Sequence, residues 1–241
     1  NARGQSVANA MQAFTAGFQE LESTTLTDEE QASLEDYFTT QFGAQLSASG
    51  AAGDGEPVDA STFIPTGAAQ SYLTLHYTVP FDNFTDAIAV DDAGDGSGYS
   101  KQHEIYHPLM RSAAATVGFS DMLIADPRSG RVIYTVAKKV DFGTSLQMGP
   151  YKNSNLAAAV ARCGVIADRS TVCLEDFSPY DPAEGAPIAF MAAPVVSDGD
   201  VIGVLVAQIS HVEIDKVVTG DRRWSQEGFG ATGEAYLVGP D

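Results

Sequence analysis

The sequence is poor in basic residues and in long apolar runs. Its 13 Lys and Arg residues stand against 32 Asp and Glu residues, and the formal net charge is -19. A surface of this sign repels phosphate backbones and anionic headgroups, so nucleic acids and anionic lipids are excluded as direct partners. No stretch of about 20 apolar residues, the length that spans a bilayer, is present.

The N-terminus lacks both a Met and the pattern of a signal peptide, because it begins with the polar residues Asn1 to Gln5. We therefore expect an excised piece of a longer chain, with any transmembrane helices outside it. The 241 residues suit one large domain or two small ones, and the apolar fraction of 44% is ordinary for a globular protein.

Cysteine is nearly absent. Cys163 and Cys173 flank the loop GVIADRSTV. In an oxidising compartment this spacing favours a disulfide, which loop entropy makes worth roughly 2.5–3 kcal/mol. The alternative is two buried thiols that never meet, so the pairing depends on an extracytoplasmic location.

Catalytic motifs are also lacking. The sequence has no G-x-S-x-G elbow and no phosphate-cradling loop. The Asp-rich loop that begins at Asp91 fails as an EF-hand, because Ala93 and Gln102 occupy two ligand positions. We expect no enzyme activity and no cofactor.

One metal-like motif remains. His103-Glu104-Ile105-Tyr106-His107 fits the H-E-x-x-H spacing of zinc hydrolases. Pro108 follows directly and disturbs the helix geometry, and no third ligand follows at the spacing of the extended motif. We expect His103 and His107 to bridge the helical part and the sheet; a zinc hydrolase is kept as an alternative.

Alternating and apolar segments predict an antiparallel sheet. Phe119–Ala125 and Val132–Val136 form a hairpin around the turn Asp126–Gly130. A helix over 153–162 follows. Three further strands are then predicted at 171–177, 186–195 and 201–209, and Asp198-Gly199 joins the last two as a hairpin turn. Five antiparallel strands with one inserted helix are the plan of a PAS-like sensor lobe.

The N-terminal part predicts helices. Apolar residues at Val7, Met11, Phe14, Phe18 and Leu21 form a heptad seam. Thr27 and Glu30 match a capping box that starts a second helix, and the two helices should form an antiparallel hairpin. Further helices are expected over 67–77 and over 99–117, the latter interrupted or offset by Pro108. A short exit helix is expected over 212–218.

Several segments resemble, in order, the double Cache type of extracytoplasmic sensor region. They are DDAGDGSGYS, HEIYHPLMR, FSDMLIADPRSGRVIYTVAKKVDFGTSL, GPYKNSNLAAAV, EDFSPYDPAEGAPIAFMAAPV and GATGEAYLVGPD. The resemblance covers roughly residues 65–241, and the N-terminal helices more weakly. The two cysteines, a truncated second lobe and the missing Arg and Trp-Tyr pair depart from the family pattern, and the last puts an amino-acid ligand in doubt.

The resemblance implies an α+β fold: an N-terminal helical hairpin or bundle followed by a PAS-like Cache lobe with a five-stranded antiparallel sheet. It divides the chain into a helical stalk and cap (1–108), a sensor lobe (109–219), and a linker with the first strand of a membrane-proximal lobe (220–241). The implied function is periplasmic ligand sensing for an inner-membrane chemotaxis receptor, sensor histidine kinase or nucleotide cyclase. A homodimer through the N-terminal helix is expected, and a non-signalling solute-binding or interaction module is the alternative.

The expected small-molecule pocket combines aromatic and polar residues around the sheet. Arg111 and Lys138 are the candidates for an anionic group. The full predicted set is Tyr106, Arg111, Asp121, Tyr134, Lys138, Asp141, Phe142, Ser145, Tyr151, Tyr180 and Phe190.

Overall fold

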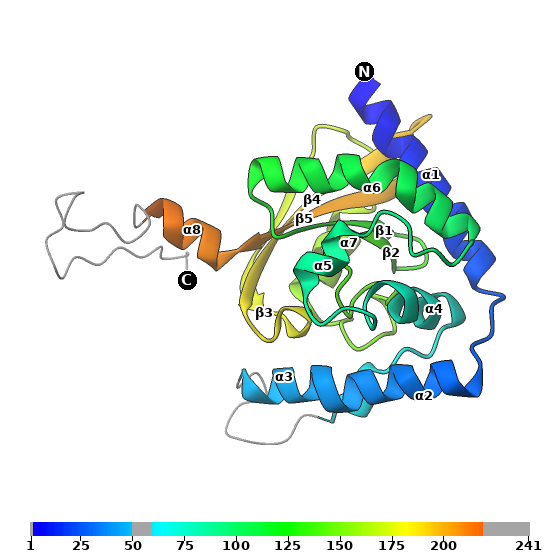
Figure 1. Ribbon diagram of the computed structural model, residues 1–241. Coiled ribbons are helices and arrows are strands. Elements are labelled where there is room, and N and C mark those ends of the chain that lie inside the picture. Colours follow the sequence, from blue (N-terminus) through cyan, green and yellow to red (C-terminus); the bar gives the residue numbers. More distant parts are fainter. Residues whose placement is uncertain (1, 50–58, 219–241) are drawn as a thin grey trace, which may run out of the picture.

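A five-stranded antiparallel sheet in the order β2-β1-β5-β4-β3 forms the centre of the fold (Figure 1). The computed structural model describes residues 2–49 and 59–218. The strands are β1 (Asp121–Asp126), β2 (Arg131–Thr135), β3 (Cys173–Pro179), β4 (Pro187–Ser197) and β5 (Asp200–Ser210). The predicted α+β arrangement, with its helical N-terminal region and antiparallel sheet, is confirmed. The segment predicted as linker and extra strand, 220–241, lies outside the described residues.

Most helices precede the sheet in sequence, α7 lies between β2 and β3 and α8 follows β5, and helices cover both faces of the sheet. They are α1 (Ala2–Leu21), α2 (Asp28–Asp36), the π-helix η1 (Tyr37–Phe42), α3 (Gly43–Ala48), α4 (Ala68–Tyr77), α5 (Phe84–Ala89), α6 (Gly98–Val117), α7 (Asn155–Cys163) and α8 (His211–Val218), with short 3₁₀ turns η2 (Ala60–Phe63) and η3 (Asp181–Ala183). Among the described residues, no helix is long and apolar enough to cross a membrane.

The two faces of the sheet carry separate hydrophobic cores. On one face, Leu123, Val206 and Phe190 pack with α7 and with the run α2–η1–α3. On the other, Met122 and Ile124 pack with α1, α4 and α6. Alternate side chains of one strand thus belong to different cores, as the period of two in a strand requires.

The N-terminal region is helical, as predicted, but its helices do not pack as a hairpin pair. Phe14 and Phe18 of α1 belong to the core beside α6, whereas Leu34, Phe38 and Phe42 of the α2–η1 run belong to the opposite core. Figure 1 shows α1 and α2 diverging from their connection. The predicted capping box at Thr27 and Glu30 is present and starts α2. α1 therefore packs mainly on α6, and the α2–η1 run packs on the opposite face of the sheet.

Pro108 does not interrupt α6, which runs through it and also through the predicted domain boundary at residue 108. Pro108 and Glu104 both lie on the exposed side of the helix. Water can therefore hydrogen-bond the Glu104 carbonyl, which has lost its N–H partner, and the helix continues.

The disulfide between Cys163 and Cys173 is formed, which settles the pairing left open by the sequence. It ties the end of α7 to the first residue of β3. No disulfide holds the connection that enters α7, which runs from Val136 to Ser154.

This connection covers the free edge of β2. Val132 N–H donates to the Thr144 carbonyl (3.0 Å), Gly143 N–H donates to the Val132 carbonyl (2.9 Å) and Leu146 N–H donates to the Gly130 carbonyl (2.7 Å). Gly143 adopts φ 78° and lies so close to α4 that an added Cβ would be 2.7 Å from the Gln70 Cα. A side chain at Gly143 would collide with the backbone of α4, and the positive φ disfavours any residue other than glycine.

We predict that Gly143→Ala destabilises the protein far more than Gly118→Ala. Both glycines have positive φ, 78° and 86°, but nothing lies within 4 Å of a Cβ at Gly118. Gly118→Ala should therefore lose only the left-handed penalty of about 1–2 kcal/mol, and Gly143→Ala roughly 1–3 kcal/mol more through overpacking. Urea denaturation of both variants measures the difference, and equal losses would contradict this packing of the connection on α4.

Candidate functional site

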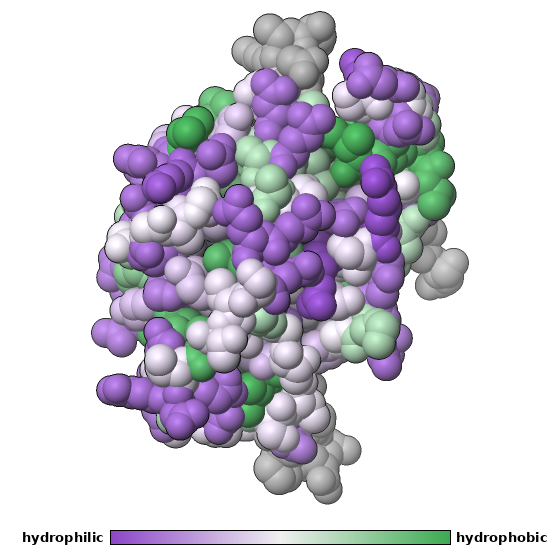
Figure 2. Space-filling view, turned by 90° about the vertical axis from the view of Figure 1, so that its right-hand side faces the viewer, coloured by the Kyte–Doolittle hydropathy of each residue, from purple (hydrophilic) through white to green (hydrophobic). Residues whose placement is uncertain are grey.

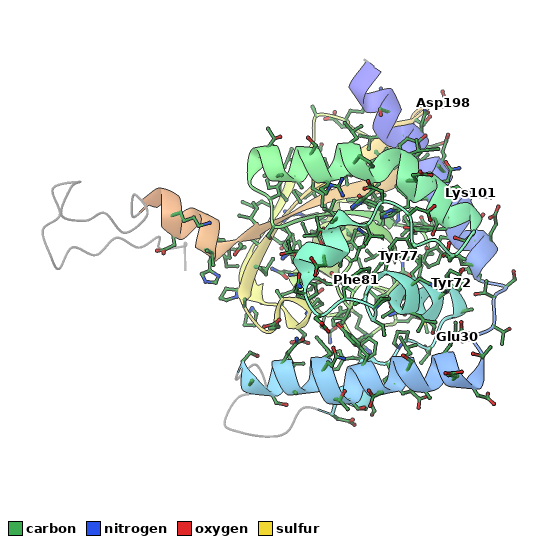
Figure 3. All side chains as sticks on the ribbon, in the orientation of Figure 1. Glu30, Tyr72, Tyr77, Phe81, Lys101 and Asp198 are labelled. Carbon is green, nitrogen blue, oxygen red and sulfur yellow. A yellow bond between two sulfur atoms is a disulfide. The ribbon has the colours of Figure 1, made fainter. Side chains whose placement is uncertain are left out.

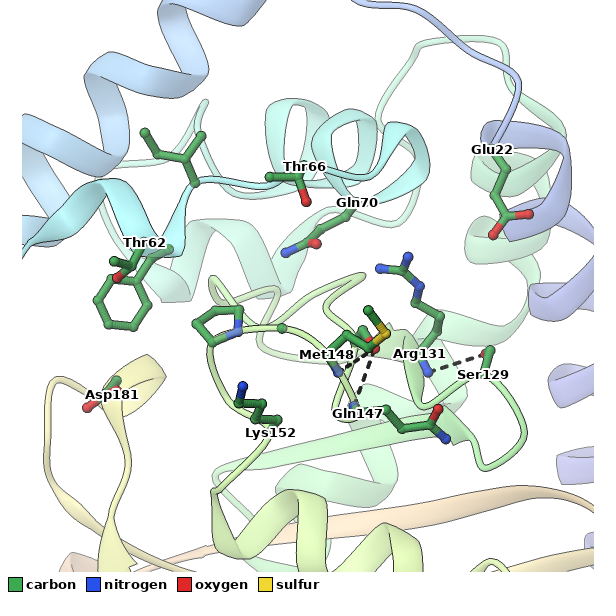
Figure 4. A pocket seen from close by; sticks show the side chains of 15 residues that line it. Glu22, Thr62, Thr66, Gln70, Ser129, Arg131, Gln147, Met148, Lys152 and Asp181 are labelled. Carbon is green, nitrogen blue, oxygen red and sulfur yellow. Dashed lines mark hydrogen bonds between the residues drawn. The ribbon is translucent and has the colours of Figure 1, made fainter.

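A cleft of about 850 Å³ opens between α4, the turn η2 and the connection after β2 (Figure 4). Polar groups dominate it, with Phe63, Ile64 and Met148 as its apolar part. Its lining residues are Glu22, Thr62, Phe63, Ile64, Thr66, Gln70, Ser129, Arg131, Ser145, Gln147, Met148, Gly149, Pro150, Lys152 and Asp181. This is the volume of an ordinary small-molecule site.

Hydrogen-bond donors reach the cleft from different elements. Arg131, the first residue of β2, is held by a bond from its Nη1 to the Gly143 carbonyl (3.3 Å). Gln70 of α4 is only 6% exposed, yet its amide extends toward the centre of the cleft in Figure 4. The Ser145 hydroxyl accepts the N–H groups of Gln147 and Met148, and Lys152 stands across from Arg131. Donors on two walls favour an acceptor-rich ligand.

A second hollow of about 220 Å³ adjoins the cleft. It shares Glu22, Gln70 and Arg131 with the cleft and adds Phe18 of α1. The cleft therefore reaches the C-terminal end of α1, and a molecule within it would touch both α1 and the sheet lobe.

Behind the cleft wall lies a buried acidic cluster. The Tyr180 hydroxyl donates to Asp141 Oδ2 (2.6 Å), and the Tyr180 ring packs against those of Tyr151 and Phe190. Burial raises the pKa of Asp141. Within the described part of the chain, Asp141 Oδ1 and the Tyr151 hydroxyl are buried without a hydrogen-bond partner. The cluster abuts the cleft, because Tyr151 lies between two lining residues in sequence and Tyr180 precedes a third.

Asp121 lies on the same side and holds the start of the connection. Its Oδ1 accepts the N–H groups of Val136 and Ala137 (both 3.0 Å), and its Oδ2 accepts the Thr135 hydroxyl (2.7 Å). Burial, followed by the negative charge of Asp141, raises the pKa of Asp121 to about 6. Its carboxylate satisfies backbone groups that would otherwise be buried unpaired.

A basic cluster on α6 and the connection holds the end of α5. His103, His107, Arg111 and Lys138 contact the five successive carbonyls of residues 87–91, where a helix end leaves its carbonyls free. The contacts are Lys138 Nζ to Ala87 O (2.7 Å) and Val90 O (3.0 Å), His107 Nε2 to Ile88 O (2.7 Å), Arg111 Nη1 to Ile88 O (3.0 Å) and Ala89 O (2.9 Å), and His103 Nδ1 to Asp91 O (2.7 Å). We call these four side chains the carbonyl clamp.

The clamp accounts for the H-E-x-x-H spacing. His103 and His107 face the same way, as their spacing predicts, and their rings stack at 4.2 Å, but they meet backbone carbonyls. Burial lowers the pKa of His107 to about 3 and that of His103 well below its usual value. Among the described residues, no group of three or more His, Cys, Asp or Glu side chains is placed to hold a metal ion.

The predicted pocket residues fall into separate groups. Asp121, Asp141, Tyr151, Tyr180 and Phe190 lie together behind the cleft. Arg111, Tyr134 and Lys138 surround His107, and Arg111 also pairs with Asp91 at 3.0 Å. Ser145 lines the cleft, while Tyr106 and Phe142 pack against Phe14 and Tyr77.

The sequence did not single out Gln70, Arg131 or Lys152. Arg131 carried a usable signal, because a polar residue starts an otherwise apolar strand directly after the turn. Gln70 carried none, since the approach of α4 to the connection is a tertiary contact between segments distant in sequence.

Comparison with known proteins gives one family. The model of the GAF domain matches residues 102–227, whereas the sequence resemblance indicated the Cache type; both are PAS-like folds. No curated protein matches. Among solved structures, the sensor domain of the histidine kinase DctB of V. cholerae is similar at 14% identity and a TM-score of 0.35. The match covers 78% of this chain and 60% of that one.

We predict that the clamp histidines make the fold acid-sensitive. The unfolded chain protonates a histidine as the pH falls through 6.5, but folded His107 binds its proton only near 3. Stability therefore falls over this window by up to about 1.4 kcal/mol per pH unit for each such histidine. Asp121 acts oppositely between 3.8 and 6, because its raised pKa lets the folded chain take up the proton first.

His107→Gln should flatten the acid limb of the stability profile, with the free energy of unfolding changing by about 2 kcal/mol less between pH 6.5 and 4.5. Urea denaturation at four values from pH 7.5 to 4.5 measures this. The slope is the readout, because the lost contacts lower stability at every pH. An acid limb as steep as that of the parent protein would contradict the neutral state of His107.

Proposed function

The chain belongs to the GAF domain family, and from this membership we propose that it is the ligand-sensing part of a signalling receptor. The observation that carries the proposal is the cleft: donors from α4, β2 and the connection after β2 face one space of about 850 Å³. Its ligand is a small molecule, and the chain itself performs no catalysis.

The cleft favours a ligand with one anionic group. Arg131 and Lys152 approach from opposite walls. In a chain of net charge -19, an anion is repelled everywhere except beside such cations. Glu22 and Asp181 also line the cleft, however, and each would repel a second negative charge. A small hydroxy acid, with its carboxylate on Arg131 and its hydroxyls on Gln70 and Ser145, matches this set of groups.

The site is placed for signal transmission. Its ligand would contact Glu22 at the end of α1 and Arg131 in the sheet lobe, two elements that a binding event can pull together. Signalling then is a shift in the population of α1 positions, driven by the difference in ligand affinity between them. A homodimer through α1 would convey the shift to the rest of the receptor.

We place the domain outside the cytoplasm, as the periplasmic part of an inner-membrane protein. The Cys163–Cys173 disulfide supports this location, because such bonds persist in oxidising compartments. Figure 2 shows a mostly hydrophilic face around the connection from α1 to α2, as suits a domain in water. Within this proposal the lobe is of the Cache type, and the output is a chemotaxis, histidine kinase or cyclase domain elsewhere in the receptor.

We predict that Arg131→Gln cuts the stabilisation by organic acids to about half or less. At one hundred times its dissociation constant, a ligand should stabilise the parent protein by about 2.7 kcal/mol, seen as a thermal shift of several degrees. The variant removes the fixed guanidinium and should lose at least tenfold in affinity, since charged hydrogen bonds contribute roughly 1.5–3 kcal/mol. A thermal shift screen of hydroxy acids followed by calorimetry gives both numbers.

Arg128→Gln is the matched control. Arg128 is an exposed arginine of the same hairpin turn and is not part of the cleft lining. The Arg128→Gln variant removes the same charge three residues from Arg131 and should leave the affinity for organic acids unchanged. Equal losses of affinity in the two variants would show that net charge alone causes the effect. If no acid stabilised the parent protein, the cleft would be refuted as the sensor site.

A further inference from the structure

A separate, smaller hollow of about 160 Å³ lies between the run η1–α3 and the segment that leads into α5. It shares no lining residue with the cleft. Tyr37 enters from η1, Phe81 and Phe84 from the α5 side, and Glu184 from the turn after η3. Figure 3 shows Phe81 in the space between α5 and α3.

The backbone around this hollow is unusual. Tyr37 opens the π-helix η1, a form that is rare and frequent at functional sites. Among the described residues, three that are not glycine have positive φ, and two of them, Lys138 (53°) and Glu184 (57°), line the hollow. Such conformations persist where the surrounding structure holds them, and they concentrate at ligand sites.

The walls combine aromatic rings with carboxylates. Asp82 and Glu184 line the hollow together with the rings of Tyr37, Phe81 and Phe84. Tyr37 is 6% exposed, and burial followed by the charge of Glu184 raises the pKa of its phenol to about 12. Negative charge therefore acts within the hollow itself, in addition to the overall negative charge of the chain.

The cations nearby are already engaged. Lys138 donates to the carbonyls of Ala87 and Val90, and burial lowers its pKa to about 7. The Lys139 ammonium lies over the Phe84 ring, 5.1 Å from its centroid. The contact between Lys139 and Phe84 shows that a ring of this hollow already attracts a cation, as the negative face of an aromatic ring does.

We propose that this hollow binds a small organic ammonium ion, held by the rings of Phe81 and Tyr37 and by the carboxylate of Glu184. The volume fits a trimethylammonium group with a short substituent. Aromatic faces and a carboxylate are the groups that recognise such ions, whose charge is too diffuse for strong hydrogen bonds. The site is additional to the acid-binding cleft and stands independently of it.

The test compares two probes of the same shape. Choline carries the charge, and 3,3-dimethylbutan-1-ol is its neutral carbon counterpart. Calorimetric titration of the full chain should show one choline site and binding of the alcohol at least about twofold weaker, since cation–π attraction contributes roughly 0.5–2 kcal/mol. Equal binding of both probes, or no choline binding, would falsify the proposal.

Two variants locate the site. Phe81→Ala removes a partly buried ring and should weaken choline binding by about 2–30-fold, the range of a cation–π contact. Glu184→Gln removes the carboxylate while keeping the side-chain length and should weaken it by up to about fivefold, as expected for an exposed ion pair. Unchanged affinity in both variants would overturn the assignment to this hollow.

Asp198→Asn is the matched control for Glu184→Gln. Asp198 is an exposed acid with a positive φ of 52°, and it lies in the β4–β5 turn. This variant makes the same change in net charge at the same kind of backbone position and should bind choline as the parent does. Arg131→Gln should also bind choline as the parent protein does, so the choline test is independent of the test of the acid-binding cleft. A loss of choline affinity in either control would overturn the proposal.

Discussion

The structure depends on burying the first part of the connection after β2. Residues 132–146, which carry β2 into the loop after it, are all buried except Lys139. Loops normally stay at the surface because buried backbone groups must find partners. Here Asp121 accepts two successive N–H groups and the Thr78 hydroxyl donates to the Lys138 carbonyl. Further bonds come from the β2 edge and from within the loop itself. Asp121 is thus a structural carboxylate, and its raised pKa follows from where it must sit.

Burying the connection also explains the carbonyl clamp. Lys138 has a positive φ and a completely buried ammonium group, so it needs acceptors that no solvent can provide. The carbonyls at the end of α5 supply them, and His103, His107 and Arg111 bind the other carbonyls of that row. The dipole of the helix end favours positive charge at this place. The basic side chains of this strongly acidic protein therefore hold the end of α5 against α6 and the connection.

Local signals predicted the elements, and tertiary contacts set the rest. Alternating strands, the Asp198-Gly199 turn and the Thr27–Glu30 capping box each act within a few residues, and each is present. The partner of His103 was not predictable, because it is a backbone carbonyl, and carbonyls have no sequence signature. Gln70 lies in the cleft because α4 packs on Gly143, a tertiary contact that no local sequence pattern predicts. Pro108 was misjudged because its effect depends on whether water reaches the helix there.

The two proposed sites border the same connection. Lys138 borders the hollow, and residues 145–152 border the cleft, so one buried segment runs from one to the other. Between them, Asp141 is tied to Tyr180, whose turn also provides Glu184 and Asp181 to the two sites. Both proposed sites therefore rest on one segment, and any coupling between their ligands would by linkage be equal in both directions.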